Sequence, residues 1–128
     1  MSTTFKPADQ TASSTASQTL VASDSGTTYF LNAAAGQAVS LPSPADGLRF
    51  RFIVATAPTS NTTTVVATAA VIEGSVTVAG LVIAGANETT ITFTANAALV
   101  GDWCELISDG TSWFISGQAT ASTGIALT

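Results

Sequence analysis

Three carboxylates lie close together near the end of the sequence: Asp102, Glu105 and Asp109. Two carboxylic groups held at the right separation can hydrolyse a glycosidic bond. The surrounding residues favour structural roles, because Asp109 precedes a glycine in a turn pair and Asp102 follows Gly101 at the start of a strand. The spacing does not match an EF-hand loop. Catalysis and cation binding at these acids remain alternatives to roles in turns and at strand ends.

Other catalytic groups are scarce in this sequence. It contains no histidine, one cysteine and three basic residues, so its many serines and threonines lack the usual general base. A pair of serine with Lys6 would need a rigidly held lysine, and Lys6 lies in a polar N-terminal stretch. Cys104 alternates with apolar residues of a strand and has no cationic neighbour, which predicts an inert buried thiol. We therefore expect no enzymatic activity, no cofactor and no metal site.

Two pairs of side chains could bind a partner. Trp103 and Trp113 could stack on sugar rings, or they could pack in a core or an interface. Arg49 and Arg51 are two residues apart in a strand and therefore share one face. They could face solvent, or they could form ion pairs with an acidic partner surface.

Composition limits the classes of partner. The net charge of −5 predicts that the chain does not bind nucleic acid or anionic membranes, which require clustered basic residues. We see no signal peptide and no apolar stretch long enough to span a bilayer, and the single cysteine has no partner within the chain. These features predict synthesis in a reducing cytoplasm. A mean hydropathy of +0.45 with 9% charged residues predicts burial of apolar surface against further copies.

Segments rich in threonine, valine and aromatic residues alternate with turn signals after residue 18. Strands separated by turns at intervals of about 8–12 residues are typical of an all-β sandwich or barrel. The predicted strands cover residues 19–22, 27–32, 38–41, 48–55, 63–67, 71–78, 81–83, 89–94, 103–107 and 113–117. Residues 95–100 could form a helical turn. The fold class is therefore all-β, an antiparallel sandwich or a barrel-like domain over residues 19–128.

Residues 1–18 are small and polar, with almost no apolar periodicity. Such a segment gains little free energy by folding alone, so we expect a flexible N-terminal arm. The arm could remain a disordered terminus, or it could become ordered on a neighbour by adding a strand to that neighbour's sheet.

Alternation predicts which residues of two regions face the core. In the segment 48–54, Leu48, Phe50, Phe52 and Val54 share one face, with Arg49 and Arg51 on the opposite face. In the C-terminal region, the Asp109-Gly110 pair predicts a hairpin between two apolar strands.

If these two residues form the whole hairpin loop, Leu106 lies opposite Trp113, and Cys104 lies opposite Ile115. A longer loop would shift this register. The other face of the hairpin then carries Trp103, Ile107 and Phe114. Because both faces are apolar, we expect one to pack in the core and the other to form a subunit interface.

Two segments also resemble small virion proteins of tailed bacteriophages. In residues 28–50 a strand ending in Leu41-Pro42 leads through a turn at Gly47 into an aromatic strand. Residues 101–113, with the sequence GDWCELISDGTSW, resemble the hairpin that follows it in such proteins. The pattern occurs both in capsid decoration (cement) proteins and in fibre or spike modules. The resemblance implies an all-β homotrimer on a virus particle, bound to the major capsid protein.

The sequence thus predicts a bacteriophage capsid decoration protein on the capsid exterior, which stabilises the assembled shell as a homotrimer. Predicted shell contacts are Phe5, Lys6, Arg49 and Arg51, and predicted trimer contacts are Trp103, Ile107 and Phe114. The alternative is a head-fibre or tail-fibre module that recognises a host glycan through exposed aromatic side chains.

Overall fold

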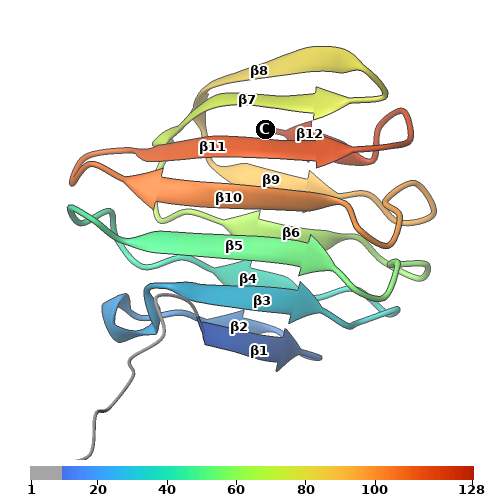
Figure 1. Ribbon diagram of the computed structural model, residues 1–128, viewed down its shortest axis with the longest axis horizontal. Helices are drawn as coiled ribbons and strands as arrows, with labels where there is room; N and C mark the ends of the chain where they lie inside the picture. The colour runs from blue at the N-terminus through green and yellow to red at the C-terminus, as the bar shows by residue number, and fades with distance from the viewer. Residues whose placement is uncertain (1–9) are drawn as a thin grey trace, which may run out of the picture.

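The structure is a computed structural model that describes residues 10–128, and it consists of two mixed β-sheets packed face to face as a sandwich (Figure 1). This confirms the all-β sandwich predicted from the spacing of strands and turns. The larger sheet, which we call sheet A, has seven strands, and the smaller sheet B has five. In order across sheet A lie β1 (Gln10–Ser14), β3 (Thr27–Leu31), β5 (Arg49–Val54), β10 (Trp103–Ser108), β11 (Trp113–Ala119), β7 (Ile72–Val78) and β8 (Leu81–Glu88).

Sheet B contains shorter strands and covers one face of sheet A. Its order is β12 (Ile125–Leu127), β9 (Thr90–Phe93), β6 (Thr63–Val66), β4 (Ala38–Ser40) and β2 (Gln18–Thr19). A short 3₁₀ turn, η1 (Ala22–Asp24), connects β2 to β3. No membrane-spanning helix occurs among residues 10–128.

The two halves of the chain build the sheets differently. The first six strands alternate between sheet A and sheet B, so successive strands within each sheet, β1, β3 and β5 or β2, β4 and β6, pair in parallel. From β7 onward most neighbours are antiparallel, and β10 is inserted between β5 and β11. The expected purely antiparallel sandwich is therefore a mixed one, because alternation between sheets brings the strands of one sheet back in the same direction.

Part of the expected N-terminal arm belongs to sheet A. Residues Gln10–Ser14 form the edge strand β1, and residues Gln18–Thr19 form β2. Backbone pairing with β3 requires no apolar side chains, which is why polarity alone did not reveal this strand. Its last residue, Ser14, is buried, and its hydroxyl oxygen accepts hydrogen bonds of 2.6 Å from the side-chain amides of Gln18 and Gln37.

Most other predicted strands occur within a few residues of their expected bounds. Two differences matter: β8 extends to Glu88, and the short strand β12 was not predicted. Where a helical turn was considered, residues 95–97 form a turn in which the Ala98 N–H donates a 2.8 Å hydrogen bond to the Thr94 carbonyl.

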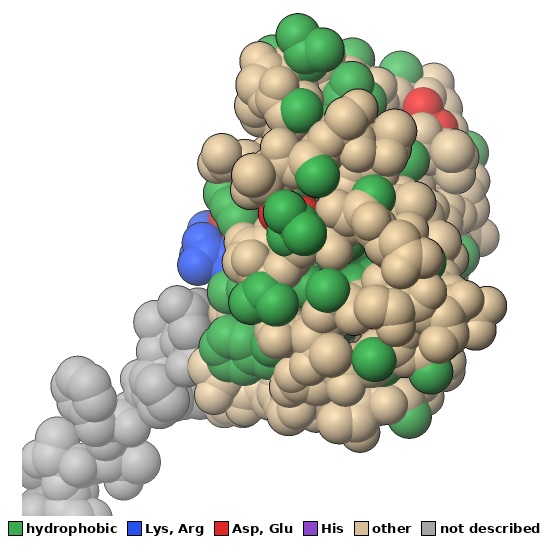
Figure 2. Space-filling view, turned by 90° about the vertical axis from the view of Figure 1, so that its right-hand side faces the viewer, with side chains coloured by type: hydrophobic (Ala, Val, Ile, Leu, Met, Phe, Trp, Pro, Cys, Tyr) green, Lys and Arg blue, Asp and Glu red, His purple; other side chains and the backbone are tan. Residues whose placement is uncertain are grey.

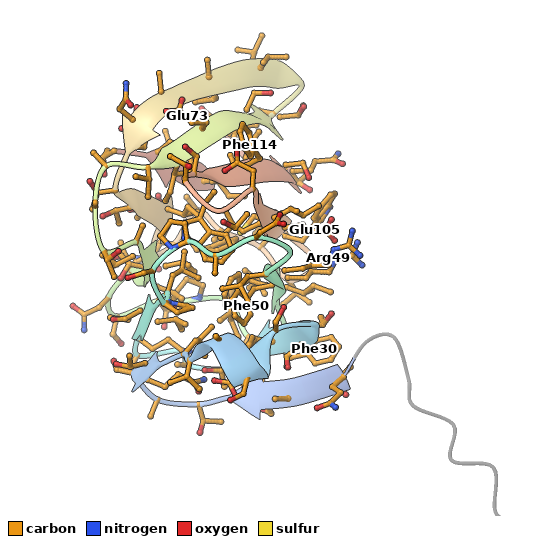
Figure 3. All side chains as sticks on the ribbon, turned by 90° about the vertical axis from the view of Figure 1, so that its left-hand side faces the viewer. Phe30, Arg49, Phe50, Glu73, Glu105 and Phe114 are labelled. Atoms are coloured by element: carbon orange, nitrogen blue, oxygen red, sulfur yellow. The ribbon has the colours of Figure 1, made fainter. Side chains whose placement is uncertain are left out.

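The core lies between the two sheets. Phe50 and Phe52 of β5 are fully buried, whereas Arg49 and Arg51 are exposed, as the alternation predicted. Figure 3 shows Arg49 on the outside of sheet A and its neighbour Phe50 between the sheets. The Phe50 ring centroid lies 5.8 Å from that of Trp113 in β11, so aromatic packing joins the middle strands.

Candidate functional site

The hairpin of β10 and β11 differs from the predicted one in its loop. Four residues, 109–112, connect the strands, and Ser108 lies opposite Trp113, Leu106 opposite Ile115 and Cys104 opposite Gly117. The loop is therefore the longer of the two alternatives, and the pairing of Leu106 with Trp113 that a two-residue loop would give does not occur. A carboxylate oxygen of Asp109 accepts 2.9 Å hydrogen bonds from the backbone N–H groups of Thr111 and Ser112, which closes the longer loop.

The faces of the hairpin nevertheless agree with the sequence analysis. Each residue's partner moved by two positions, and a shift of two leaves every side chain on the same face. The inner face carries four buried side chains: Cys104, Leu106, Trp113 and Ile115. On the outer face Trp103 is partly exposed, and Ile107 and Phe114 are 39% and 47% exposed.

The outer face of sheet A, meaning the side turned away from sheet B, brings together most of the predicted contact residues. Strand register aligns them in three rows across β5, β10 and β11: Arg49, Ile107 and Phe114; Arg51, Glu105 and Ser116; and Ile53, Trp103 and Gln118. The predicted shell contacts in β5 and the predicted trimer contacts in β10 and β11 therefore interleave on one surface. They are not two separate sites.

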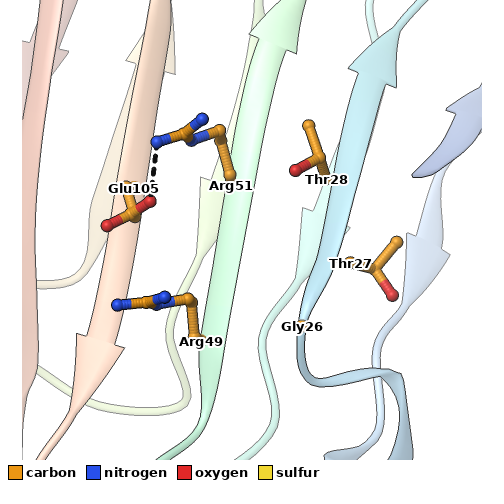
Figure 4. Close-up of a pocket in the computed structure, with 6 residues that line it drawn as sticks. All are labelled: Gly26, Thr27, Thr28, Arg49, Arg51 and Glu105. Carbon is orange, nitrogen blue, oxygen red and sulfur yellow. Dashed lines mark ion pairs between the residues drawn. The ribbon is translucent and has the colours of Figure 1, made fainter. Parts of the chain in front are cut away.

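Charged groups organise the middle of this outer face. The Arg51 guanidinium lies 3.0 Å from the Glu105 carboxylate (Figure 4). It also lies 5.6 Å from the centroid of the Trp103 ring. An exposed ion pair contributes about 0–1 kcal/mol, and a cation–π contact contributes about 0.5–1 kcal/mol at such sites. These contacts orient Arg51 more than they stabilise the fold. Arg49 forms no ion pair with any of residues 10–128.

A small polar hollow lies beside the two arginines. It has a volume of about 80 Å³ and is lined by Gly26, Thr27, Thr28, Arg49, Arg51 and Glu105 (Figure 4). It is too small for a drug-sized ligand, which occupies pockets of about 300 Å³ or more. Its chemistry suits a single carboxylate or hydroxyl group of a partner surface.

The three acids that could have formed a catalytic cluster are dispersed. Asp102 and Asp109 lie just beyond opposite ends of β10, about 23 Å apart at the rise of an extended strand. Asp102 is buried, and its carboxylate accepts hydrogen bonds from the backbone N–H groups of Leu99 at 2.8 Å and Thr120 at 3.1 Å. Glu105 is paired with Arg51, and Asp109 closes the hairpin loop. Each acid thus has a structural partner of its own.

The thiol and the second tryptophan are core residues. Burial, followed by the neighbouring Glu105 charge, raises the pKa of the Cys104 thiol far above its ordinary value, so the nucleophilic thiolate does not form near neutral pH. Trp113 is fully buried, and its indole N–H has no hydrogen-bond partner among residues 10–128. Of the two tryptophans considered for glycan stacking, only Trp103 reaches the surface.

Some predicted residues cannot be placed, and others were missed. Phe5 and Lys6 lie outside the described residues. Phe30 belongs to the outer face and was not predicted, although alternation with the buried Tyr29 and Leu31 could have revealed it. No cluster of three or more potential metal ligands occurs in the described part of the chain.

Comparisons with known proteins identify no relative of this chain. No protein-family model matches the chain, and no curated protein and no solved structure matches it.

Proposed function

We propose that this chain is a structural virion protein that decorates a bacteriophage capsid and stabilises the assembled shell as a homotrimer. Support comes from the resemblance of residues 28–50 and 101–113 to such proteins, and from the sandwich fold in which both segments lie. Both segments contribute strands to the outer face of sheet A.

The observation that carries the proposal is the composition of that outer face. Ile107 and Phe114 are exposed large apolar residues, and Arg49 beside them is a cation without an ion pair in the described chain. A surface that combines apolar anchors with an arginine is typical of protein interfaces. The predicted shell contacts and the predicted trimer contacts interleave on this face. We therefore propose that the capsid shell and the neighbouring subunits of the trimer both contact it.

The mechanism would be linked binding. A protein that binds the assembled lattice more tightly than its dissociated subunits stabilises the lattice by the difference in binding free energy. A trimer presents three copies of the same contact surface, so the second and third contacts form at high effective concentration and release is slow.

The experiment that tests this function is the copy number of the chain relative to the major shell protein, by quantitative mass spectrometry of purified source particles. The expected result is a ratio near one trimer for each threefold position of the shell lattice. Absence from particles would overturn the proposal.

A receptor-binding fibre module is the second candidate, and the partly exposed Trp103 favours it, because indole rings stack on sugars. A few copies per particle would support this alternative. Saturable glycan binding that is lost in Trp103→Ala would support it further. Trp113→Ala is unsuitable for this test, because Trp113 lies in the core.

A further inference from the structure

The edge of sheet A formed by β8 is the most apolar exposed surface among the described strands. Leu81 and Val82 are 68% and 71% exposed, and Ile83 is 37% exposed. Figure 2 shows hydrophobic side chains at the upper end of the molecule, where Figure 1 draws β7 and β8. Because β8 ends the strand order, its outward-facing N–H and C=O groups have no neighbouring strand in the described chain.

An apolar groove continues this edge into the sandwich. It has a volume of about 310 Å³, and its walls include Leu81 and Ile83 from β8, Val78 from β7, and Ile125 and Leu127 from β12. The groove therefore lies between the ends of the two sheets, beside the unpaired backbone of β8.

The first five residues of the β8 edge, 81–85, lack the features that keep sheet edges from pairing, and the irregularity in the β7–β8 pairing lies beyond them, between Gly85 and Glu88. Natural edge strands carry lysines, prolines, inward-pointing charges, β-bulges or a covering loop. Residues 81–87 include no charged residue and no proline. Five or more consecutive edge residues of this kind form a ready template for another strand.

We propose that β8 pairs with β8 of a second copy of this chain, antiparallel and about a twofold axis, so that sheet A continues across the two copies. The most apolar register places Val82 opposite Val82 of the second copy and Leu81 opposite Ile83. Apolar side chains directly across a strand pair stabilise the pairing. The same pairing brings apolar side chains of the second copy to the groove.

Charge does not oppose this occupant at the contact itself. Two copies with a net charge of −5 each repel one another, but β8 presents an uncharged surface until Glu88 at its end. In the Val82 register, the two Glu88 residues lie about 40 Å apart at the rise of an extended strand, which is well beyond the screening length of physiological salt.

The opposite edge of the sheet fits β8 less well. The β1 strand offers Gln, Thr, Ala and two Ser side chains, which leave Leu81 to Ile83 without apolar partners. Pairing of β8 with β1 would also be heterologous, because the two copies would use different edges. These two edges of one sheet face opposite directions. Such contacts build open filaments rather than a closed assembly.

The first test is a disulfide cross-link in the full chain. Val82→Cys introduces one accessible thiol, because the native Cys104 is buried. Residues directly opposite in an antiparallel pair have Cα atoms about 4.5–5.5 Å apart, within the range that a disulfide spans. Under mild oxidation, most Val82→Cys chains are expected to run as covalent dimers on non-reducing gels. Thr11→Cys, on the exposed β1 edge, is the matched control and should stay single.

The second test is the solution mass of the uncross-linked protein by light scattering. Val82→Lys places two cations at the twofold axis, so its mass should be half that of the wild type, with unchanged β-rich circular dichroism. Thr11→Lys should keep the wild-type mass. The halving is expected with or without the proposed trimer. Two trimers joined through β8 would separate from six chains into three, and a simple dimer would separate into single chains.

A wild-type protein of three chains in solution would be the proposed trimer without β8 pairing and would overturn the pairing alone, as would a Val82→Cys chain that stays monomeric under oxidation. The edge would then accept a strand of another protein. A dimer that cross-links at Val82→Cys, from a protein absent from virus particles, would support the pairing while overturning the proposed function.

Discussion

The two faces of the β10–β11 hairpin carry similar residues and have different roles. The inner face places Trp113 and Leu106 in the core without exposure, whereas the outer face leaves Phe114 half exposed and Trp103 partly exposed. An aromatic residue therefore does not by itself indicate a binding site. Its position in the strand alternation, together with the sheet that covers one side, decides whether it stabilises the fold or remains available to a partner.

The acidic residues Asp102 and Glu105 show the same contrast between the inner and the outer face. Asp102 is buried and holds two backbone N–H groups, while Glu105 lies three residues later on the outer face, paired with an exposed arginine. We therefore expect inner substitutions to change the free energy of unfolding and outer substitutions to leave it nearly unchanged.

The largest effect is expected at Trp113. Trp113→Ala should lower the free energy of unfolding by about 3–5 kcal/mol, because it leaves a cavity beside Phe50 in the core. Phe114→Ala, its sequence neighbour on the outer face, should cost less than about 1 kcal/mol. Urea unfolding of both variants measures the difference. Equal losses would mean that Phe114 is as important to the fold as Trp113.

A smaller effect is expected at the acids. Asp102→Ala should cost about 1–3 kcal/mol, because the backbone N–H groups of Leu99 and Thr120 lose their acceptor. Glu105→Ala removes an exposed ion pair and should cost about 0–1 kcal/mol. Thermal or urea unfolding compares the two variants. A larger loss for Glu105→Ala would show that the outer ion pair is structural.

The smallest effect concerns pH and the hairpin loop. Hydrogen bonds from the backbone of Ser112 and Thr111 lower the pKa of Asp109 in the folded protein. Its carboxylate therefore stabilises the fold above the unfolded pKa of about 3.9, and this contribution is lost as the pH falls through the lower folded pKa. The difference in stability between wild type and Asp109→Asn should shrink as the pH is lowered from about 6 to about 2.5. A difference independent of pH would assign the loop's stability to other contacts.

Much of the fold could be predicted from local patterns. Period-two alternation located β5 and assigned Phe50 and Phe52 to the core and Arg49 and Arg51 to the outside. The even shift of the hairpin register left its faces as predicted, although the sequence did not decide between a two-residue loop and the longer loop that forms. Strand β1 was not predicted, because its pairing depends on a neighbouring backbone and its side chains are polar.

The candidate contact face was only partly predictable. Each of Arg49, Trp103, Ile107 and Phe114 was chosen from its own strand, but their common surface results from the insertion of β10 between β5 and β11. Nothing in the local pattern of β8 distinguishes it from a buried strand, because LVIAG is as apolar as a core segment. Only the strand order places it at an edge.

The sequence by itself determined that this protein is all-β and contains no histidine, because side-chain alternation and composition are local properties. The tertiary structure decided which strands are neighbours, and hence which exposed side chains form a surface. The order of the strands depends on the alternation of the first six strands between the two sheets, and on pairings between residues that are far apart in the chain. Backbone hydrogen bonds of this kind form equally well with many partners, so only the packing of the whole core selects one arrangement.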